Sequence, residues 1–429
     1  MRILFIHQNL PAQFTHPIRA LCASGEHEVY GIAAEHAMAR CAQIHPGLKL
    51  LGYKPPGPAT GAAPATPGEA PPASAAPRLH PYLTDADNQV RRGQAVARAL
   101  LALKNKGITP DVALAHPGWG ESLFFKDIFP DVPLIGYFEY FFTARGGDVG
   151  FDPEFPDSID NQCRLRVRNA LYLSALESAD VGLTPTHWQQ SRFPAALRSK
   201  IEVIHEGVDT EANQPDPQAR FEWQGQIFEA GQPIITYVAR GLEPYRGFHG
   251  FMRALPELLR RNPQARVLIV GGDAVSYGRS HPSKRSWREV LLDEVGPELD
   301  ASRVFFTGKL PRDAYLKVLQ VSAAHVYLTY PFVLSWSMLE AMACGALIIG
   351  SRTAPVEEVI RHGENGLLVD FFDREALLST VTNALNQAAA LQPLRAAARA
   401  TVVARYDLRS RALPATLALI ERVARPPQA

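Results

Sequence analysis

Short apolar runs alternate with helix-length segments along most of the chain. In the first half, the opening run leads through a polar loop, Pro11 and a helical pattern ending at Gly25 to the second run. Runs spaced in this way predict parallel strands joined by helices, and the first two indicate a βαβ unit. We therefore expect an α/β first half with strands at Ile3–Ile6, Val29–Ile32, Val112–Ala115, Leu134–Phe138, Val181–Thr184 and Ile201–Ile204.

The second half repeats the pattern more regularly. Six apolar runs, each separated by a helix-length segment, predict a doubly wound parallel sheet. In such sheets ligands bind beyond the carboxyl ends of the strands, so the chemistry is expected in the loops that follow the runs. The runs lie at Ile234–Ala239, Val267–Val270, Val304–Phe306, Val326–Thr329, Leu347–Ile349 and Leu367–Val369.

Two polar segments divide the chain. Residues 211–233 are rich in polar residues, proline and glycine, which is typical of a connection between domains, so we expect domains at 1–212 and 213–405. With 429 residues the chain is long enough for two hydrophobic cores. Residues 55–77 consist largely of proline, alanine and glycine and predict a flexible surface insertion in the first domain.

Composition narrows the classes of partner. The formal net charge of +1 gives no electrostatic reason to expect nucleic acid, so any anion site must be local. The four cysteines lack disulfide or zinc-ligand spacing, which predicts no metal site and favours the cytoplasm. The apolar run at the N-terminus is broken by His7, Gln8 and Asn9 and is too short to span a membrane, so any membrane association is expected to be peripheral.

The strongest candidate site is the segment from Ser335 to Gly345, which predicts a loop, a helix and a turn into a strand. Ser335, Trp336 and Ser337 stand at the expected helix start, where free N–H groups and the helix dipole favour a diphosphate. Glu340 is expected in the first turn, within reach of sugar hydroxyls. A capping box between Ser337 and Glu340, which needs no ligand, is the alternative.

Two further strand ends in the second half carry candidates. Arg240 and Arg246 flank the loop after the first run, and two guanidinium groups there can clamp a diphosphate and stabilise it as a leaving group. A surface ion pair between Arg246 and Glu243 is the alternative. Gly272 and Asp273 follow the second run, where glycine lets the backbone approach a ligand closely.

In the first half, His116 stands in a loop rich in glycine and proline after an apolar run, where its imidazole can contact a sugar or an acceptor. Asn9 and Glu139 follow two other runs and are candidates on the acceptor side. The aromatic residues around Glu139 suit sugar faces, although they fit a hydrophobic core equally well. A histidine in a loop is more often structural, so composition alone does not decide its role.

Taken together, the chain resembles the retaining family 4 glycosyltransferases, and the resemblance covers nearly its whole length. The resemblance is closer to a bacterial subgroup whose N-terminus reads like His7–Phe14. Five segments carry it: His205–Thr210, Arg240–Gly247, Val304–Gly308, Leu339–Gly345 and Asn365–Val369.

The resemblance implies a GT-B fold, in which two Rossmann-like domains face each other across a cleft. The first domain is then the acceptor domain and the second the nucleotide-sugar domain. Residues 406–429 are expected to form a helix that crosses back to the first domain.

The resemblance also assigns roles to residues. Glu340 corresponds to the family glutamate that holds the ribose, Arg240 and Arg246 correspond to the pair that holds the diphosphate, and His116 aligns with a position near both sugars. The family's first glutamate of the E-x7-E pattern falls on Phe332, which cannot bind a sugar hydroxyl. The identity of the donor sugar is therefore left open.

The expected activity is transfer of a sugar from a nucleoside diphosphate sugar to a glycan or lipid-linked glycan acceptor, with retention of configuration and without a metal or another cofactor. Such bacterial enzymes assemble polysaccharides and glycoconjugates, here at the inner face of the membrane. A sugar-nucleotide epimerase on the same fold and a degenerate subunit that only binds nucleotide are the alternatives.

Overall fold

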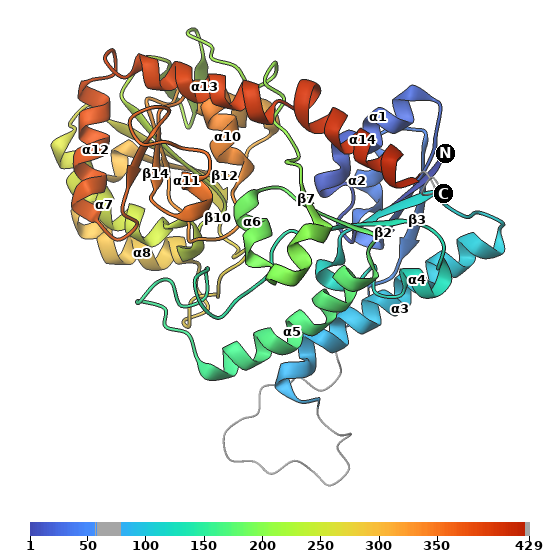
Figure 1. The fold of residues 1–429 in the computed structure, drawn as a ribbon. Coiled ribbons are helices and arrows are strands. Elements are labelled where there is room, and N and C mark those ends of the chain that lie inside the picture. The colour runs from blue at the N-terminus through green and yellow to red at the C-terminus, as the bar shows by residue number, and fades with distance from the viewer. Residues whose placement is uncertain (56, 58–78, 425–429) are drawn as a thin grey trace, which may run out of the picture. The chain divides into compact units, whose positions relative to one another are not determined.

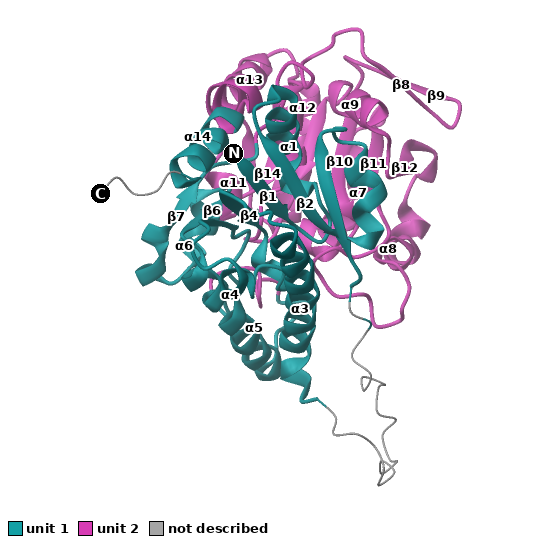
Figure 2. Cartoon of the chain, turned by 90° about the vertical axis from the view of Figure 1, so that its right-hand side faces the viewer, with its two compact units in different colours: residues 1–145, 153–206, 413–429 teal, residues 146–152, 207–412 magenta. Residues whose placement is uncertain are grey.

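The computed structural model describes residues 1–55, 57 and 79–424, so nearly all of the expected insertion at 55–77 lies outside the described residues. The chain divides into two compact units (Figures 1 and 2). Unit 1 comprises residues 1–145, 153–206 and 413–429, and unit 2 comprises residues 146–152 and 207–412. Each unit is built on a parallel β-sheet, as the alternation of strands and helices predicts.

The sheet of unit 1 has seven parallel strands in the order β3-β2-β1-β4-β5-β6-β7. Six of them coincide with predicted runs to within a few residues, and β3 was missed. β3 is an edge strand that pairs with β2 only. Four of its six residues are partly or fully exposed, so its apolar pattern is weak. The strands are β1 (Arg2–Ile6), β2 (Glu28–Ala34), β3 (Leu48–Tyr53), β4 (Val112–Ala115), β5 (Leu134–Tyr137), β6 (Val181–Thr184) and β7 (Ile201–Val203).

Both faces of this sheet are buried. Along β1, Ile3 and Phe5 belong to one hydrophobic cluster, and Leu4 and Ile6 belong to another. Since successive side chains of a strand point to opposite faces, the two clusters are the cores on the two sides of the sheet. The helices of unit 1 are α1 (Thr15–Ser24), α2 (Met38–Ala42), α3 (Thr84–Asn105), α4 (Phe125–Ile128), α5 (Ile159–Ser178), α6 (His187–Arg192) and α14 (Leu413–Ala424).

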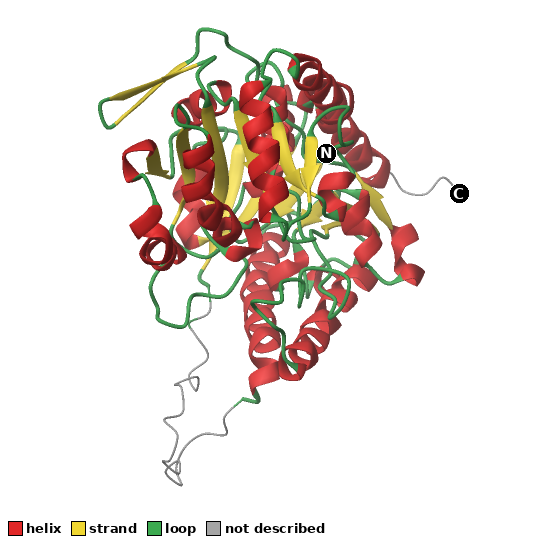
Figure 3. Cartoon of the chain, turned by 90° about the vertical axis from the view of Figure 1, so that its left-hand side faces the viewer, coloured by secondary structure: helices red, strands yellow, loops and turns green. Residues whose placement is uncertain are grey.

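The sheet of unit 2 has six parallel strands in the order β12-β11-β10-β13-β14-β15. Helices cover these strands on the face seen in Figure 3. The strands are β10 (Ile234–Gly241), β11 (Arg266–Gly272), β12 (Val304–Gly308), β13 (Ala324–Tyr327), β14 (Ile348–Ser351) and β15 (Leu367–Val369). The helices are α7 (Phe248–Arg261), α8 (Trp287–Val295), α9 (Arg312–Gln320), α10 (Trp336–Ala343), α11 (Ala354–Glu357), α12 (Arg374–Asn386) and α13 (Gln392–Tyr406).

The expected connection at 211–233 contains a β-hairpin, β8 (Arg220–Trp223) and β9 (Gln226–Glu229), that the prediction missed. Gln224 and Gly225 form its turn with positive φ angles of 50° and 74°. Phe221 and Phe228 are buried in the core of unit 2, whereas their neighbours are mostly exposed. One buried residue per strand is too short a pattern to distinguish a strand from a loop.

The chain passes from unit 1 to unit 2 between Glu206 and Gly207, six residues before the expected boundary. The backbone N–H of Val208 donates to the carbonyl of Tyr406, and Thr210 donates to the Asp407 carboxylate. These contacts tie residues after Glu206 to unit 2. After Ala412 the chain returns to unit 1, where α14 contacts α1 and β4.

Among the described residues, we find no helix that is both long enough and apolar enough to span a membrane.

A buried polar network crosses the sheet of unit 2. The Thr236 hydroxyl on β10 lies 2.6 Å from the Ser322 hydroxyl and 2.8 Å from Nδ1 of His325 on β13. Burial lowers the pKa of His325 to about 3, and its Nε2 has no hydrogen-bond partner among the described residues. His325 is therefore neutral in the folded chain.

Because His325 is buried and neutral, we expect the free energy of unfolding to fall at acidic pH. Below about pH 6.5 the unfolded chain binds a proton at His325 that the folded chain binds only near pH 3, so stability falls as the pH falls through this window. In His325→Gln, which keeps a polar group but does not titrate, the loss of unfolding free energy between pH 7 and pH 5 should be about 2 kcal/mol smaller. Chemical denaturation at both pH values measures it, and identical losses in the two proteins would contradict the assignment.

Candidate functional site

Arg240 lies near the carboxyl end of β10 with its side chain exposed. It makes no hydrogen bond or ion pair with any residue that the structure describes. Its guanidinium therefore remains available to an anion at the edge of the sheet where ligands are expected.

Arg246, six residues later, is 7% exposed. Its Nη1 donates to the Thr329 hydroxyl and the Val333 carbonyl, both at 2.9 Å, and lies 3.4 Å from the Tyr327 hydroxyl. All of these partners are neutral, and no carboxylate within the described part of the chain pairs with the guanidinium. A buried positive charge without a counter-charge is unfavourable, so the site is suited to an incoming anion.

The expected alternative, an ion pair between Arg246 and Glu243, is wrong. Glu243 is fully buried, and its carboxylate accepts hydrogen bonds from the backbone N–H groups of Ser276, Tyr277 and Gly278 at 2.7–3.4 Å. It thereby fixes the loop after β11 instead of neutralising the arginine. The guanidinium of Arg246 lies 5.4 Å from the centre of the Tyr277 ring in that same loop.

Lys309 is a cation that the sequence patterns did not single out. It directly follows β12, is exposed and has no hydrogen bond or ion pair with the described residues. A Cβ atom at Gly272 would lie 2.8 Å from Lys309 Cε and 3.6 Å from the Arg240 carbonyl oxygen. Gly272 thus allows Lys309 to lie across the end of β11, close to the backbone of Arg240, which places a second cation at the same edge of the sheet.

The start of α10 is joined to Arg246 through Tyr327. The backbone N–H of Ser335 donates to the Tyr327 hydroxyl at 2.8 Å, the same oxygen that Arg246 approaches. Ser335 is the N-cap, its hydroxyl accepts from the N–H of Ser337, and Trp336 is 45% exposed. The positive end of the helix dipole is therefore close to the buried guanidinium, which adds to the attraction for an anion.

Glu340 lies in the second turn of α10, because the helix begins at Trp336, and the first-turn position expected from the sequence is wrong. Arg312 pairs with one carboxylate oxygen at 2.6 Å, and the Tyr315 hydroxyl donates to the other at 2.5 Å. The alternative capping box with Ser337 does not form. Both partners come from α9, and since a carboxylate accepts about four hydrogen bonds, acceptor capacity remains for other donors.

Phe332, at the position of the family's first glutamate, is 2% exposed. Its ring centre lies 4.9 Å from that of Tyr277 and 5.5 Å from that of Tyr245. The side chain is thus part of an aromatic cluster next to Arg246. Asp273, by contrast, is on the surface and pairs with Arg288 at 2.8 Å, so the structure does not bring it to the cations.

In unit 1, His116 caps the turn after β4 and is 2% exposed. Its Nδ1 accepts from the Gly118 N–H at 3.1 Å, so the proton of the neutral ring is on Nε2. That Nε2 lies 3.7 Å from a Glu139 oxygen and has no hydrogen-bond partner among the described residues. The ring stacks on Trp119 with centres 4.4 Å apart.

His7, after β1, repeats this arrangement. Its Nδ1 accepts from the Asn9 N–H at 2.8 Å, and its buried Nε2 likewise lacks a partner in the described residues. Burial, and then the neighbouring His116, hold the pKa of His7 well below its usual value. The ring centres of the two histidines are 5.0 Å apart, so two imidazoles lie side by side at the edge of the sheet.

Glu139 and Tyr137 lie beside His116, and each is hydrogen-bonded to a further oxygen-bearing side chain. Glu139 accepts from the Gln13 amide at 3.5 Å, and the Tyr137 hydroxyl donates to Glu206. Gln13 Oε1 and Glu206 Oε2 are buried and have no hydrogen-bond partner within the described residues, although His205 Nε2 lies 3.6 Å from Glu206 Oε2. The cluster therefore offers both donors and acceptors, the combination that binds sugar hydroxyls.

The loop that carries His116 has its own support. Arg92 donates to the Trp119 carbonyl at 2.8 Å and lies 3.7 Å from the buried carboxylate of Glu121. Tyr53 donates to Glu121 at 3.0 Å, and burial raises the pKa of Glu121.

Asn9 is committed to other contacts. Its side-chain oxygen lies 2.8 Å from His36 Nε2, and its carbonyl accepts from Arg40. Its backbone N–H orients His7, so its contribution to the cluster is indirect.

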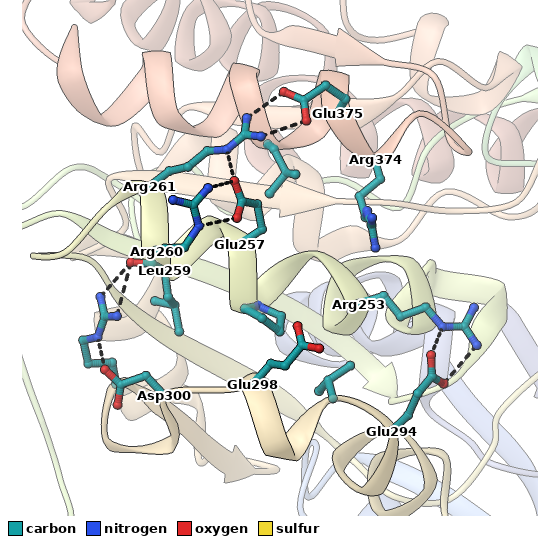
Figure 4. Close-up of a pocket in the computed structure, with 14 residues that line it drawn as sticks. Arg253, Glu257, Leu259, Arg260, Arg261, Glu294, Glu298, Asp300, Arg374 and Glu375 are labelled. Atoms are coloured by element: carbon teal, nitrogen blue, oxygen red, sulfur yellow. Dashed lines mark hydrogen bonds and ion pairs between the residues drawn. The ribbon is translucent and has the colours of Figure 1, made fainter.

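An open cavity of 1080 Å³ lies between α7, α8 and α12 of unit 2, and contains none of the predicted site residues (Figure 4). Its arginines are largely paired, for example Arg261 with Glu257 and Glu375 and Arg253 with Glu294. With its charges compensated, this cavity has less attraction for an anion than the end of β10.

Two family models match consecutive parts of the chain. One is described as the glycosyl transferase family 4 group and matches residues 26–213, and the other as glycosyl transferases group 1 and matches residues 219–401.

Two curated relatives match about half of the chain at less than 30% identity. A GDP-mannose-dependent alpha-(1-6)-phosphatidylinositol monomannoside mannosyltransferase of Mycolicibacterium smegmatis is 29% identical over 229 residues, covering 51% of this chain and 55% of the relative. A D-inositol 3-phosphate glycosyltransferase of Rhodococcus jostii is 26% identical over 212 residues, covering 49% and 45%. The chain thus spans about half the length of the curated relatives it matches.

Solved structures share the fold. Sucrose-phosphate synthase from Thermosynechococcus elongatus superimposes with a TM-score of 0.70 at 17% identity, covering 99% of both chains. Anabaena HepE in complex with UDP and glucose superimposes with a TM-score of 0.66 at 15% identity, covering 98% of this chain and all of the other. With two parallel-sheet units and a family model on each half, the chain belongs to the family 4 glycosyltransferases and has the GT-B fold.

Proposed function

We propose that the chain transfers a hexosyl group from a nucleoside diphosphate sugar to an acceptor hydroxyl with retention of anomeric configuration. The observation that carries this proposal is the buried Arg246, whose charge meets neutral partners and no carboxylate among the described residues. A donor diphosphate supplies the missing negative charge. Arg240, Lys309 and the start of α10 add further positive potential at the same edge of the sheet.

In the reaction, the bond between the anomeric carbon and the β-phosphate oxygen breaks, and its electron pair leaves with the nucleoside diphosphate. The acceptor oxygen bonds to the same face of the anomeric carbon and gives its proton to a β-phosphate oxygen. Charge builds on the diphosphate in the transition state, so cations that are fixed beforehand lower the barrier. No protein nucleophile is needed.

Unit 1 is proposed to bind sugar hydroxyls. Nε2 of His116 and Nε2 of His7 are buried without a hydrogen-bond partner in the described chain, and the Glu139 carboxylate is an acceptor beside His116. Imidazole N–H groups are donors that suit sugar hydroxyls.

The names of similar proteins provide candidates for the donor base and the acceptor. The mycobacterial relative is named for GDP-mannose and phosphatidylinositol monomannoside, and the Anabaena structure for UDP and glucose. We propose a glycan or lipid-linked glycan as the acceptor, polysaccharide or glycoconjugate assembly as the role, and the inner face of the membrane as the location.

The direct test is product analysis by NMR. The purified chain in EDTA is incubated with UDP- and GDP-hexoses of α configuration and candidate acceptors. An α-linked product that forms only with an acceptor supports the proposal. A β-linked product would refute retention, and a donor epimer formed without an acceptor would refute transfer.

Removing either arginine should slow the chemical step. Arg240→Ala and Arg246→Ala are each expected to lower turnover by about 30- to 1000-fold, equivalent to about 2–4 kcal/mol of lost transition-state stabilisation. Arg260→Ala, on the exposed surface of α7, is the matched control and should keep wild-type turnover. Wild-type rates in both clamp variants would show that the diphosphate binds elsewhere.

Glu340 is proposed to hold the ribose with its remaining lone pairs. Glu340→Gln should weaken binding of a ribonucleoside diphosphate about tenfold, because a neutral amide is a poorer acceptor than a carboxylate, and should leave binding of the 2′,3′-dideoxy analogue unchanged. Calorimetry with both nucleotides measures the difference. If the variant lost stability but bound both nucleotides as the wild type does, Glu340 would have only the structural contacts with α9.

A further inference from the structure

Residues Gly146–Asp152, which we name the strap, belong to unit 2, although the chain on both sides of them belongs to unit 1. Gly146 and Gly150 have φ angles of 70° and 68°, which non-glycine residues rarely adopt, so the strap can turn at both positions. The segment was not assigned a role by the sequence patterns.

The first anchor of the strap is Asp148, which is 2% exposed. Its carboxylate accepts a hydrogen bond of 2.7 Å from the hydroxyl of Tyr245. Tyr245 directly precedes Arg246, so this contact fixes the side chain next to the buried guanidinium.

The second anchor is Asp152, which is 3% exposed. It accepts from the Tyr330 hydroxyl at 2.7 Å and lies 3.0 Å from His249 Nε2. Between the two anchors, the ring of Phe151 packs at 5.1–5.2 Å from the rings of Tyr330, Phe371 and Phe372. Two buried carboxylates and an aromatic ring thus hold the strap.

The two tyrosines belong to the backbone that surrounds Arg246. The Tyr330 N–H donates to the Tyr245 carbonyl at 3.0 Å, and the rings of the two residues lie 4.8 Å apart. Tyr330 also directly follows Thr329, whose hydroxyl accepts from Arg246. The strap therefore contacts Tyr245, which precedes Arg246, and Tyr330, which follows the Arg246 acceptor Thr329.

We propose that the strap is a positioning element for the donor diphosphate, in which Asp148 and Asp152 hold Tyr245 and Tyr330 so that Arg246 is fixed before the donor binds. Asp148 and Asp152 do not touch the donor in this scheme and act through the two tyrosines. A group that is fixed in advance loses less freedom when its ligand binds, which raises affinity. The inference rests on the proposed function in one respect, the binding of a diphosphate by Arg246.

The test removes the two tyrosine hydroxyls and keeps the rings, in a Tyr245→Phe and Tyr330→Phe double variant. Calorimetry compares UDP and GDP with UMP and GMP. The double variant should bind the preferred diphosphate about tenfold more weakly and the matching monophosphate within about twofold of wild type, since only the diphosphate reaches Arg246. Retained monophosphate binding shows that the variant is folded.

Tyr82→Phe is the matched control, because it removes another tyrosine–aspartate hydrogen bond, from Tyr82 to Asp160 in unit 1. It should leave the ratio of diphosphate to monophosphate affinity unchanged. An unchanged ratio in the double variant as well would overturn the proposal, as would an equal loss of affinity for both nucleotides, which indicates general destabilisation.

Hydrogen exchange in the nucleotide-free protein separates this proposal from the proposed function. The N–H groups of Arg246 and Tyr330, bonded to the Glu243 and Tyr245 carbonyls, should exchange at least about fivefold faster in the double variant. If the wild type bound no nucleotide, the proposed function would fail, and faster exchange would still support the strap. Unchanged exchange would overturn it.

Discussion

The buried guanidinium of Arg246 is the constraint on which the candidate site depends. It is surrounded by a hydroxyl and a carbonyl oxygen instead of a carboxylate, so the folded chain carries a charge that a ligand can compensate. The neighbouring acidic residue does not neutralise this charge. Glu243, the acid nearest in sequence, is turned away to bind three backbone N–H groups, which leaves the positive potential intact.

The parallel strands bring the candidate residues of each unit together. Because all strands of a sheet run in the same direction, residues far apart in sequence meet at one edge: Arg240 near the end of β10, Gly272 at the end of β11 and Lys309 directly after β12 in unit 2. In unit 1 the same rule brings His7 and His116 together after β1 and β4. The cations of one unit suit a diphosphate, and the imidazole donors of the other suit hydroxyls.

Much of the fold was readable from the sequence, because strands buried on both faces appear as continuous apolar runs. The edge strand β3 and the hairpin at 220–229 were missed because each is half exposed. Arg240, Arg246 and His116 stand out in the sequence as candidates, whereas Lys309 and the contacts around these residues do not. The contacts of Glu340 with Arg312, of Lys309 with Gly272 and of Asp148 with Tyr245 join residues 28 to 97 positions apart, and no local pattern encodes them.

The most direct test of the central claim is calorimetric titration of the wild-type chain, in EDTA, with a nucleoside diphosphate and the matching monophosphate. A clamp built on Arg246 binds the β-phosphate, so we predict that the diphosphate binds at least about tenfold more tightly, equivalent to about 1.4 kcal/mol. Equal affinities for the two nucleotides would contradict it, because the buried charge would then take no part in binding the donor.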